Sequence, residues 1–182
     1  MTRAPATPFG HPHGVTLTRR FPDDPETLFA AFTDPEALRQ WWGPSDFRID
    51  TIVFSPRVGD VYRVTLTAPD GSRWAHEGRI LEVERPHRLT YTWQWTEGPL
   101  SRVETLVELV FSPDGGGTVV SVTHSRFVSD TECEAHATGW TDTFDRIGAW
   151  LRRSRKDGIS GVPGRAATPA PAQARPPRTN TP

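Results

Sequence analysis

The sequence of 182 residues has a single cysteine, a single methionine and no long uninterrupted apolar stretch. With only Cys133 available, an intramolecular disulfide and a zinc site built on several thiolates are both excluded. No run approaches the roughly 18 apolar residues that a membrane-spanning helix needs. Residues 1–14 also lack the apolar run of a secretory signal. We therefore expect a cytoplasmic protein without a membrane span.

Prolines are distributed unevenly along the chain. Of the 18 prolines, three fall in residues 1–14 and six in residues 157–182. The hydrophobic share of 35% is low for a chain that is folded throughout. The sequence thus predicts one domain over residues 15–156, with disordered segments at 1–14 and 157–182.

The net charge of −1 conceals an asymmetry. Residues 152–182 carry a charge of +6 and residues 1–14 a charge of +1, which leaves −8 for residues 15–151. An acidic folded region argues against nucleic-acid binding by the domain. The positive charges of the C-terminal segment are diluted among Pro, Ala and Thr, which is typical of a solvated tail.

The first elements have clear boundary signals. Val15–Phe21 alternates apolar and polar residues, which predicts a half-buried strand. A helix should follow from Pro25, capped by Asp23 or Asp24, with Leu28, Phe29 and Phe32 as its buried stripe. A second short helix should run from Pro35 through Gln40 into Trp41-Trp42 and end at Gly43-Pro44.

Six runs with strand-like patterns and turn signals between them come next. They are Phe47–Phe54, Val61–Thr67, Arg73–Glu84, Leu89–Thr96, Arg102–Phe111 and Thr118–Phe127. Short consecutive strands joined by tight turns indicate an antiparallel meander with one buried face. In the fourth run, Leu89, Tyr91, Trp93 and Trp95 share one face, and Thr90, Thr92, Gln94 and Thr96 should share the wet one.

The last element is a long amphipathic helix over residues 130–156. Ser129 and Glu132 have the spacing of a capping box. Apolar side chains recur on one face of this helix, at Cys133, Ala137, Trp140, Phe144, Ile147 and Leu151. The helix would be roughly 40 Å long, enough to cross a whole sheet.

The predicted fold class is α+β. A curved antiparallel sheet of about seven strands should grip the long C-terminal helix, with two short helices after the first strand. Such an arrangement leaves room between sheet and helix at its open end, so we expect an elongated and mostly apolar cavity.

Several segments in this order resemble a known family. They are Arg20-Phe21, Thr33-Asp34-Pro35-Glu36, Gln40-Trp41-Trp42, Arg57-Val58-Gly59-Asp60, Glu84 to Trp93, Thr118 to His124 and Gly139-Trp140. Together they resemble the bacterial single-domain relatives of the C-terminal domain of the activator of Hsp90 ATPase (AHSA1-like). These proteins belong to the START/Bet v 1-like (SRPBCC) helix-grip superfamily, whose members include ligand carriers and enzymes.

The resemblance covers about residues 15–151 and implies a helix-grip fold more specifically than it implies a function. The eukaryotic co-chaperone engages Hsp90 through a separate N-terminal domain, so an Hsp90 contact is not expected from this domain alone. The resemblance also allows a homodimer.

The aromatic row on one face of the fourth strand is the most informative feature for function. The sequence predicts a ligand cavity lined by Tyr91, Trp93, Trp95, His124, Trp140, His76 and Phe144. Plain core packing is the alternative interpretation of these side chains, since aromatic residues bury large areas in any one-sided sheet. Trp41 and Trp42 are expected to plug the helical end of the cavity or to anchor the turn there.

His124 and His76 are weak catalytic candidates. A histidine that points into the cavity could orient a ligand or act as an acid or base near neutral pH. The alternative is a core histidine that is satisfied by a neighbour. His136 lies one residue off the helix stripe, where it could face the cavity mouth. No short-spaced ligand pair supports a metal site, and no phosphate-cradling or dinucleotide-binding motif indicates a cofactor.

Some further residues are expected to have structural roles. Arg63, Arg79, Arg102 and Glu104 should lie on the wet face of the sheet, and the alternative is an Arg that points inward and pairs with an acidic ligand. Gly78 should mark a bulge. Gly139 should let the last helix approach the sheet or a ligand closely.

Three functions remain open from the sequence. The first is a binding protein for an apolar or aromatic small molecule, held between sheet and helix. The second is an enzyme with cyclase-like or hydrolase-like acid–base chemistry in the same cavity. The third is a chaperone or regulatory module that acts through its surface.

Overall fold

The computed structural model describes residues 13–100 and 102–156. The segments predicted to be disordered, 1–14 and 157–182, lie outside this range except for residues 13 and 14. The elements are β1 (Gly14–Phe21), α1 (Pro25–Ala31), α2 (Pro35–Leu38), β2 (Arg48–Val53), β3 (Val61–Thr67), β4 (Arg73–Glu84), β5 (Arg88–Glu97), β6 (Thr105–Asp114), β7 (Gly117–Ser125) and α3 (Asp130–Lys156).

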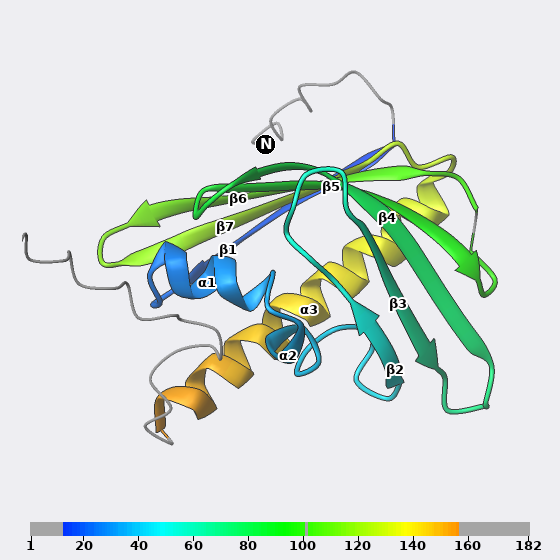
Figure 1. Ribbon diagram of the computed structural model, residues 1–182, viewed down its shortest axis with the longest axis horizontal. Coiled ribbons are helices and arrows are strands. Elements are labelled where there is room, and N and C mark those ends of the chain that lie inside the picture. The colour runs from blue at the N-terminus through cyan, green and yellow to red at the C-terminus, as the bar shows by residue number, and fades with distance from the viewer. Residues whose placement is uncertain (1–12, 101, 157–182) are drawn as a thin grey trace, which may run out of the picture.

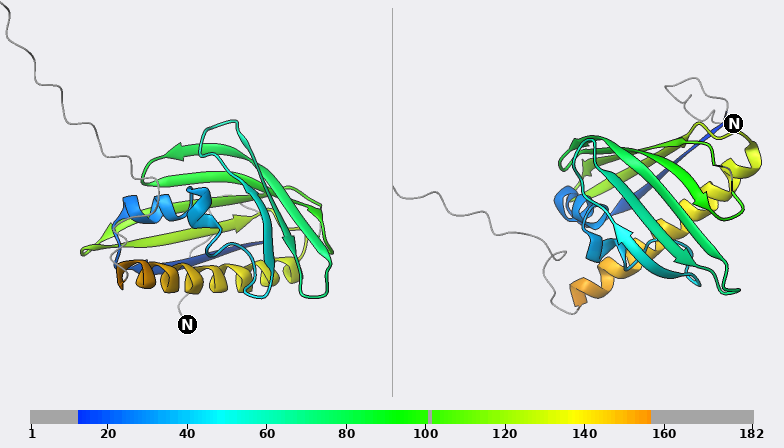
Figure 2. Two further views of the ribbon diagram at one scale, coloured as in Figure 1. Left: turned by 60° about the horizontal axis from the view of Figure 1, so that its bottom comes forward. Right: turned by 45° about the vertical axis from the view of Figure 1, so that its right-hand side comes forward.

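The strands form one seven-stranded antiparallel sheet that curves around α3. Their order across the sheet is β1-β7-β6-β5-β4-β3-β2, so the meander from β2 to β7 is continuous and β1 pairs with its last strand. The long α3 lies along the concave side, and α1 and α2 cover one end of the same side (Figures 1 and 2). This arrangement confirms the predicted α+β helix-grip fold.

The short helices begin where capping predicts. The Asp24 carboxylate accepts a hydrogen bond from the backbone N–H of Thr27 at 2.9 Å, which satisfies a donor that the first turn of α1 leaves free. The predicted stripe of Leu28, Phe29 and Phe32 is buried. The second helix is shorter than predicted, because α2 ends at Leu38 and the chain continues through turns to Trp42.

The bounds of α3 agree with the predicted helix. The Ser129 hydroxyl accepts a hydrogen bond from the Glu132 N–H at 3.3 Å, as in the expected cap. Four residues of the apolar stripe are buried, whereas Cys133 and Ala137, near the start of the helix, are half-buried. Among the helices that the structure describes, none is long and apolar enough to cross a membrane.

A solid aromatic core fills the end of the molecule near α1. Phe29 and Phe32 both contact Phe111 of β6 edge-on, with ring centroids 5.5 Å apart in each pair. Phe144 of α3 packs against Phe21 of β1 in the same manner, at 6.0 Å. Side chains therefore hold sheet and helix together at this end.

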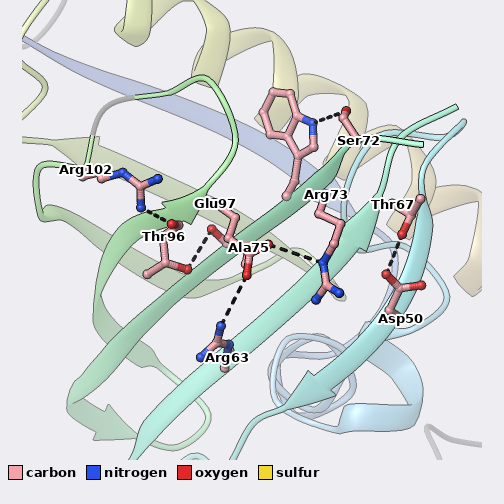
Figure 3. A network of polar contacts seen from close by, with 10 residues as sticks. Asp50, Arg63, Thr67, Ser72, Arg73, Ala75, Thr96, Glu97 and Arg102 are labelled. Atoms are coloured by element: carbon pink, nitrogen blue, oxygen red, sulfur yellow. Dashed lines mark hydrogen bonds and ion pairs between the residues drawn. The ribbon is translucent and has the colours of Figure 1, made fainter. Parts of the chain in front are cut away.

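The outer face of the sheet carries charged side chains across β2 to β5, as predicted for its wet face. Arg63 lies 3.8 Å and Arg73 3.4 Å from the two carboxylate oxygens of Glu97, and Asp50 accepts a hydrogen bond from Thr67 (Figure 3). Arg79 of β4 is a further exposed residue of this surface, whereas Arg102 and Glu104 are exposed in the segment that precedes β6. Solvent-exposed ion pairs of this kind contribute little to stability individually.

The predicted alternation along β5 is only partly correct. Thr90 and Thr92, expected on the wet face, are 7% and 5% exposed. Thr90 pairs with Glu82, and its hydroxyl donates to the Glu82 carboxylate at 3.1 Å. Thr92 lies where the β4–β5 pairing is irregular, with register shifts between Ala75 and His76 and again between Ile80 and Glu82. Between these shifts the Thr92 hydroxyl accepts a hydrogen bond from the Arg79 N–H, which draws it into the sheet.

Gly78 lies between the two register shifts. A Cβ at this position would stand 1.7 Å from the backbone oxygen of Thr92. The residue is thus required for close approach of two backbones, in keeping with the predicted irregularity.

Candidate functional site

The interface between the sheet and α3 is hollow at the end away from α1. A cavity of about 290 Å³ lies between strands β3 to β5, the loop after α2 and the first half of α3. Six of the seven tryptophans line this cavity: Trp41, Trp42, Trp74, Trp93, Trp95 and Trp140. Three histidines lie among them: His76, His124 and His136.

Each of the three histidines accepts a hydrogen bond from one indole N–H. Trp42 Nε1 donates to His76 Nε2 at 3.0 Å, and the two rings are inclined by only 13°. Trp93 stacks on both, with its centroid 3.7 Å from that of His76 and 5.8 Å from that of Trp42. These contacts place Trp42 and His76 side by side against one face of Trp93 and form a flat aromatic wall.

The second pair joins β7 to α3. Trp140 Nε1 donates to His124 Nδ1 at 3.2 Å, so the proton of the neutral His124 ring resides on Nε2. That nitrogen lies 2.8 Å from the Thr105 hydroxyl oxygen, to which it donates. The Thr105 hydroxyl in turn donates to the carbonyl of Trp93 at 2.9 Å. Both nitrogens of His124 are therefore engaged.

The third pair lies between β5 and the start of α3. Trp95 Nε1 donates to His136 Nε2 at 3.2 Å. The other ring nitrogen, Nδ1, lies 2.8 Å from the backbone carbonyl oxygen of Glu132 and donates to it. His136 is thus also held as a neutral ring with both nitrogens engaged.

Burial keeps these histidines neutral. Desolvation lowers the pKa of His76 and of His124 well below the usual histidine value, and proximity to His136 lowers both further. Burial also lowers the pKa of His136, against the opposing effects of the Glu132 carbonyl and carboxylate. A proton on the accepting nitrogen of any of these rings would also break its indole hydrogen bond.

Two buried N–H groups in the wall have no hydrogen-bond partner among the described residues. They are Nδ1 of His76 and Nε1 of Trp93, on the two stacked rings. His76 Nδ1 bears the proton because its other nitrogen accepts from Trp42. An unpaired buried donor costs about 1–3 kcal/mol.

The helical wall of the cavity is formed by small and polar residues. Ala135, Gly139, Asp142 and Thr143 of α3 line it, with Gly139 near the centre of this face. The sequence predicts that Gly139 lets the helix approach the sheet or a ligand closely, but a Cβ at this position would meet no atom within 4 Å. The approach of α3 to the sheet therefore does not depend on this glycine, which borders open space.

The structure brings five of the seven predicted cavity residues together: His76, Trp93, Trp95, His124 and Trp140. The other two do not line this cavity. Tyr91 packs against Tyr62 and Phe54, further along β5, and Phe144 lies in the solid core beside Phe21.

Sequence reasoning did not identify Trp74 as a lining residue. Trp74 lies two residues before His76 on β4 and shares its face, so the alternation of that strand contained the signal. Trp41 and Trp42, expected to plug or anchor this end, both line the cavity. Trp41 also anchors the turn, because its indole N–H donates to the carbonyl of Ala31 at 3.0 Å.

The residues present do not resemble a metal centre. Within residues 13–100 and 102–156, no group of three His, Cys, Asp or Glu side chains is arranged to hold a metal ion. Although the rings of His124 and His136 lie 4.8 Å apart, their lone pairs accept from Trp140 and Trp95.

A comparison with models of known protein families shows to which family the chain belongs. The family model described as activator of Hsp90 ATPase homolog 1-like protein matches residues 24–152. The chain belongs to this family. The match covers both short helices, strands β2 to β7 and most of α3, so the family's domain includes every side chain that lines the cavity.

Solved structures of several bacterial proteins share the fold, and one of the three described next is named AHSA1. A Rhodobacter sphaeroides protein is 27% identical with a TM-score of 0.68, and the match covers 78% of this chain and 93% of that one. The AHSA1 protein from Silicibacter pomeroyi is also 27% identical, with a TM-score of 0.70 and coverage of 78% and 99%. A Chromobacterium violaceum protein is 25% identical, with a TM-score of 0.68 and coverage of 76% and 96%. Among curated proteins, no match to the chain was found.

Proposed function

We propose that this protein binds a small apolar or aromatic molecule in the cavity between the sheet and α3. The observation that carries the proposal is the gathering of six tryptophans around a space that no side chain of the described residues fills. At the opposite end of the same interface, phenylalanines of the sheet contact phenylalanines of α1 and α3 directly. Larger side chains could fill the cavity in the same way. An unfilled apolar cavity loses van der Waals contacts, and a bound ligand would restore them.

The size of the cavity supports a ligand of one or two rings. A buried cavity of about 150 Å³ holds benzene, and the space here is about 290 Å³. The flat wall formed by Trp42, His76 and Trp93 favours a planar molecule that stacks on it. A hydrogen-bond acceptor on the ligand would pair with the free N–H of His76 or Trp93, after a small adjustment of these tightly packed rings.

The hydrogen bonds of the three histidines favour binding over acid–base catalysis. A general base needs a free lone pair within reach of its substrate. The lone pairs of His76, His124 and His136 accept from Trp42, Trp140 and Trp95. In this arrangement the histidines orient the tryptophans, and none of them is available as a proton acceptor.

A chaperone or regulatory module that acts only through its surface has less support. Such a protein would need no open cavity, and membership of the activator of Hsp90 ATPase homolog 1-like family does not by itself transfer chaperone activation to this chain. A sensor that binds a small molecule and then a partner remains consistent with the proposal.

We also propose a cytoplasmic location, supported by the single cysteine, which forms no intramolecular disulfide.

Native mass spectrometry of protein purified gently from its own cells tests the proposal. We expect a reproducible additional mass that is released on denaturation. The matched pair of variants is Gly139→Leu, which fills the cavity from the centre of its helical wall, and Thr141→Leu, which adds a similar side chain on the exposed opposite face of α3. The additional mass should disappear with Gly139→Leu and persist with Thr141→Leu.

Two outcomes would contradict the proposal. An apo mass for the wild-type protein under all gentle conditions would exclude a tightly held ligand. An additional mass that Gly139→Leu and Thr141→Leu retain equally would place the ligand outside this cavity.

A further inference from the structure

The charge distribution around the cavity narrows the class of ligand. Among the described residues that line the cavity, Asp142 is the one acidic side chain, and none is a Lys or Arg. No hydrogen bond or salt bridge joins the Asp142 carboxylate to another described residue. Arg146, one turn further along α3, interacts electrostatically with the Asp142 carboxylate. Its guanidinium, however, donates to the carbonyls of Trp42 and Gly43 and does not line the cavity.

The tryptophans present mainly the faces of their rings to a ligand, and few of their N–H groups are available as hydrogen-bond donors. Five of the six lining indole N–H groups are already used. Three donate to the histidines, one donates to the Ala31 carbonyl and one to the Ser72 hydroxyl. The face of an indole ring carries negative electrostatic potential and attracts cations more strongly than any other side-chain ring.

The histidines add no positive charge that would oppose this attraction. Burial lowers the pKa of His76, His124 and His136, and each ring is neutral in its hydrogen-bonded form. Glu132, in the first turn of α3, adds a further negative charge near His136. The cavity therefore combines a wall of indole rings with one carboxylate and no cationic side chain.

We propose that the ligand is an organic cation, an amine or quaternary ammonium group on a small apolar or aromatic body. Its body stacks among the tryptophans, and Asp142 attracts its charge at the exposed edge of the cavity. This inference rests on the proposed function, because it specifies the ligand of the same site. It predicts that an anionic ligand, such as an aromatic carboxylate, binds more weakly than a cation of similar shape, because no cationic side chain of the described residues lines the cavity and only the N–H groups of His76 and Trp93 could pair with it.

The test compares two probes that have nearly the same shape and differ in charge. Phenyltrimethylammonium is the cation and tert-butylbenzene is its neutral isostere. Both are titrated at low ionic strength into the full chain, and binding is followed through the indole N–H resonances in NMR spectra. We expect the cation to bind about tenfold more tightly than the neutral isostere, within the range of cation–π energies.

Two variants of α3 that each remove one negative charge test whether the Asp142 carboxylate contributes to binding of the cation. Asp142→Asn should weaken binding of phenyltrimethylammonium by about twofold to fivefold, as expected for a partly exposed ion pair, and leave tert-butylbenzene unchanged. Glu134→Gln removes the same charge from an exposed position of α3 that does not line the cavity, and it should leave both affinities unchanged.

The outcomes separate this inference from the proposed function. Equal or tighter binding of tert-butylbenzene, or an unchanged preference in Asp142→Asn, would overturn the cation assignment while supporting a cavity that binds neutral molecules. Failure of both probes to shift any indole resonance of the wild-type protein would overturn the binding function and the cation assignment together.

Discussion

The indole N–H of Trp42 donates to Nε2 of His76 at 3.0 Å, across 34 positions of sequence. This bond joins the loop after α2 to the centre of β4 and fixes the tautomer of a fully buried histidine. It also holds both rings against Trp93. The geometry of the aromatic wall therefore depends on a polar contact inside an otherwise apolar site.

A double-mutant cycle should measure this contact. Trp42→Phe leaves the His76 lone pair without a donor, and His76→Phe leaves the Trp42 N–H without an acceptor. Each single variant is therefore destabilised by an unpaired buried polar group that is absent from the double variant. We expect a coupling energy of about 1–3 kcal/mol in urea unfolding. The control cycle combines Trp150→Phe with His76→Phe, because Trp150 lies near the end of α3 and does not line the cavity, and its two changes should be additive within about 0.5 kcal/mol.

The neutral histidines make stability depend on pH. The folded protein holds His76, His124 and His136 at lowered pKa values, while the unfolded chain binds protons near pH 6.5. The unfolded state therefore binds more protons below about pH 6.5, so the free energy of unfolding falls as the pH decreases from there. Each histidine contributes a slope of up to about 1.4 kcal/mol per pH unit until its folded pKa is reached.

Urea denaturation at pH 7.5, 6.5 and 5.5 checks this dependence. The slope below pH 6.5 should decrease in His76→Phe, apart from any constant loss of stability that the substitution causes. His87→Ala, at an exposed position, should retain the wild-type slope. A stability that is constant from pH 7.5 to 5.5 in the wild-type protein would show that the histidines are not held neutral by folding.

Arg146 should position the tryptophan-bearing loop. Its guanidinium donates to the carbonyls of Trp42, at 3.4 Å, and Gly43, at the point where Gly43 turns the chain with a φ of 74°. Arg146→Met keeps much of the apolar stem but removes both donors. We expect a loss of about 1–3 kcal/mol in unfolding free energy and altered indole resonances of Trp41 and Trp42. Arg153→Met, at an exposed position nearer the end of α3, should leave those resonances in place.

Local patterns of the sequence were sufficient for most of the fold. Asp24 and Ser129 fix the starts of α1 and α3 through capping, and the strands begin and end at turn residues that the sequence displays. The irregular register between β4 and β5 was not predictable, because it depends on how the backbones meet at Gly78. For the same reason the burial of Thr92 contradicts the simple alternation.

The candidate site was predictable as a face but not as a set of contacts. Alternation places Tyr91, Trp93 and Trp95 on one side of β5, yet only the last two reach the cavity, since Tyr62 and Phe54 cover Tyr91. The pairing of each histidine with one tryptophan joins residues on different elements. No spacing rule connects such partners, because the curvature of the sheet decides which of them meet.

Two glycines should respond in opposite ways to alanine. Gly139→Ala adds a Cβ that meets no atom within 4 Å and removes a poor helix former, so we expect stabilisation by up to about 1 kcal/mol. Gly78→Ala would place its Cβ 1.7 Å from the Thr92 oxygen and 2.6 Å from the Thr92 carbonyl carbon. Backbone atoms cannot move by that distance without breaking the β4–β5 pairing, so this variant should lose more than about 3 kcal/mol of unfolding free energy or fail to fold.

Thermal unfolding followed by circular dichroism compares the stabilities of the two alanine variants. Because an alanine methyl group occupies little of the cavity, Gly139→Ala should keep the additional mass that Gly139→Leu loses, and destabilisation by Gly139→Ala would show that α3 packs more closely there than this structure has it.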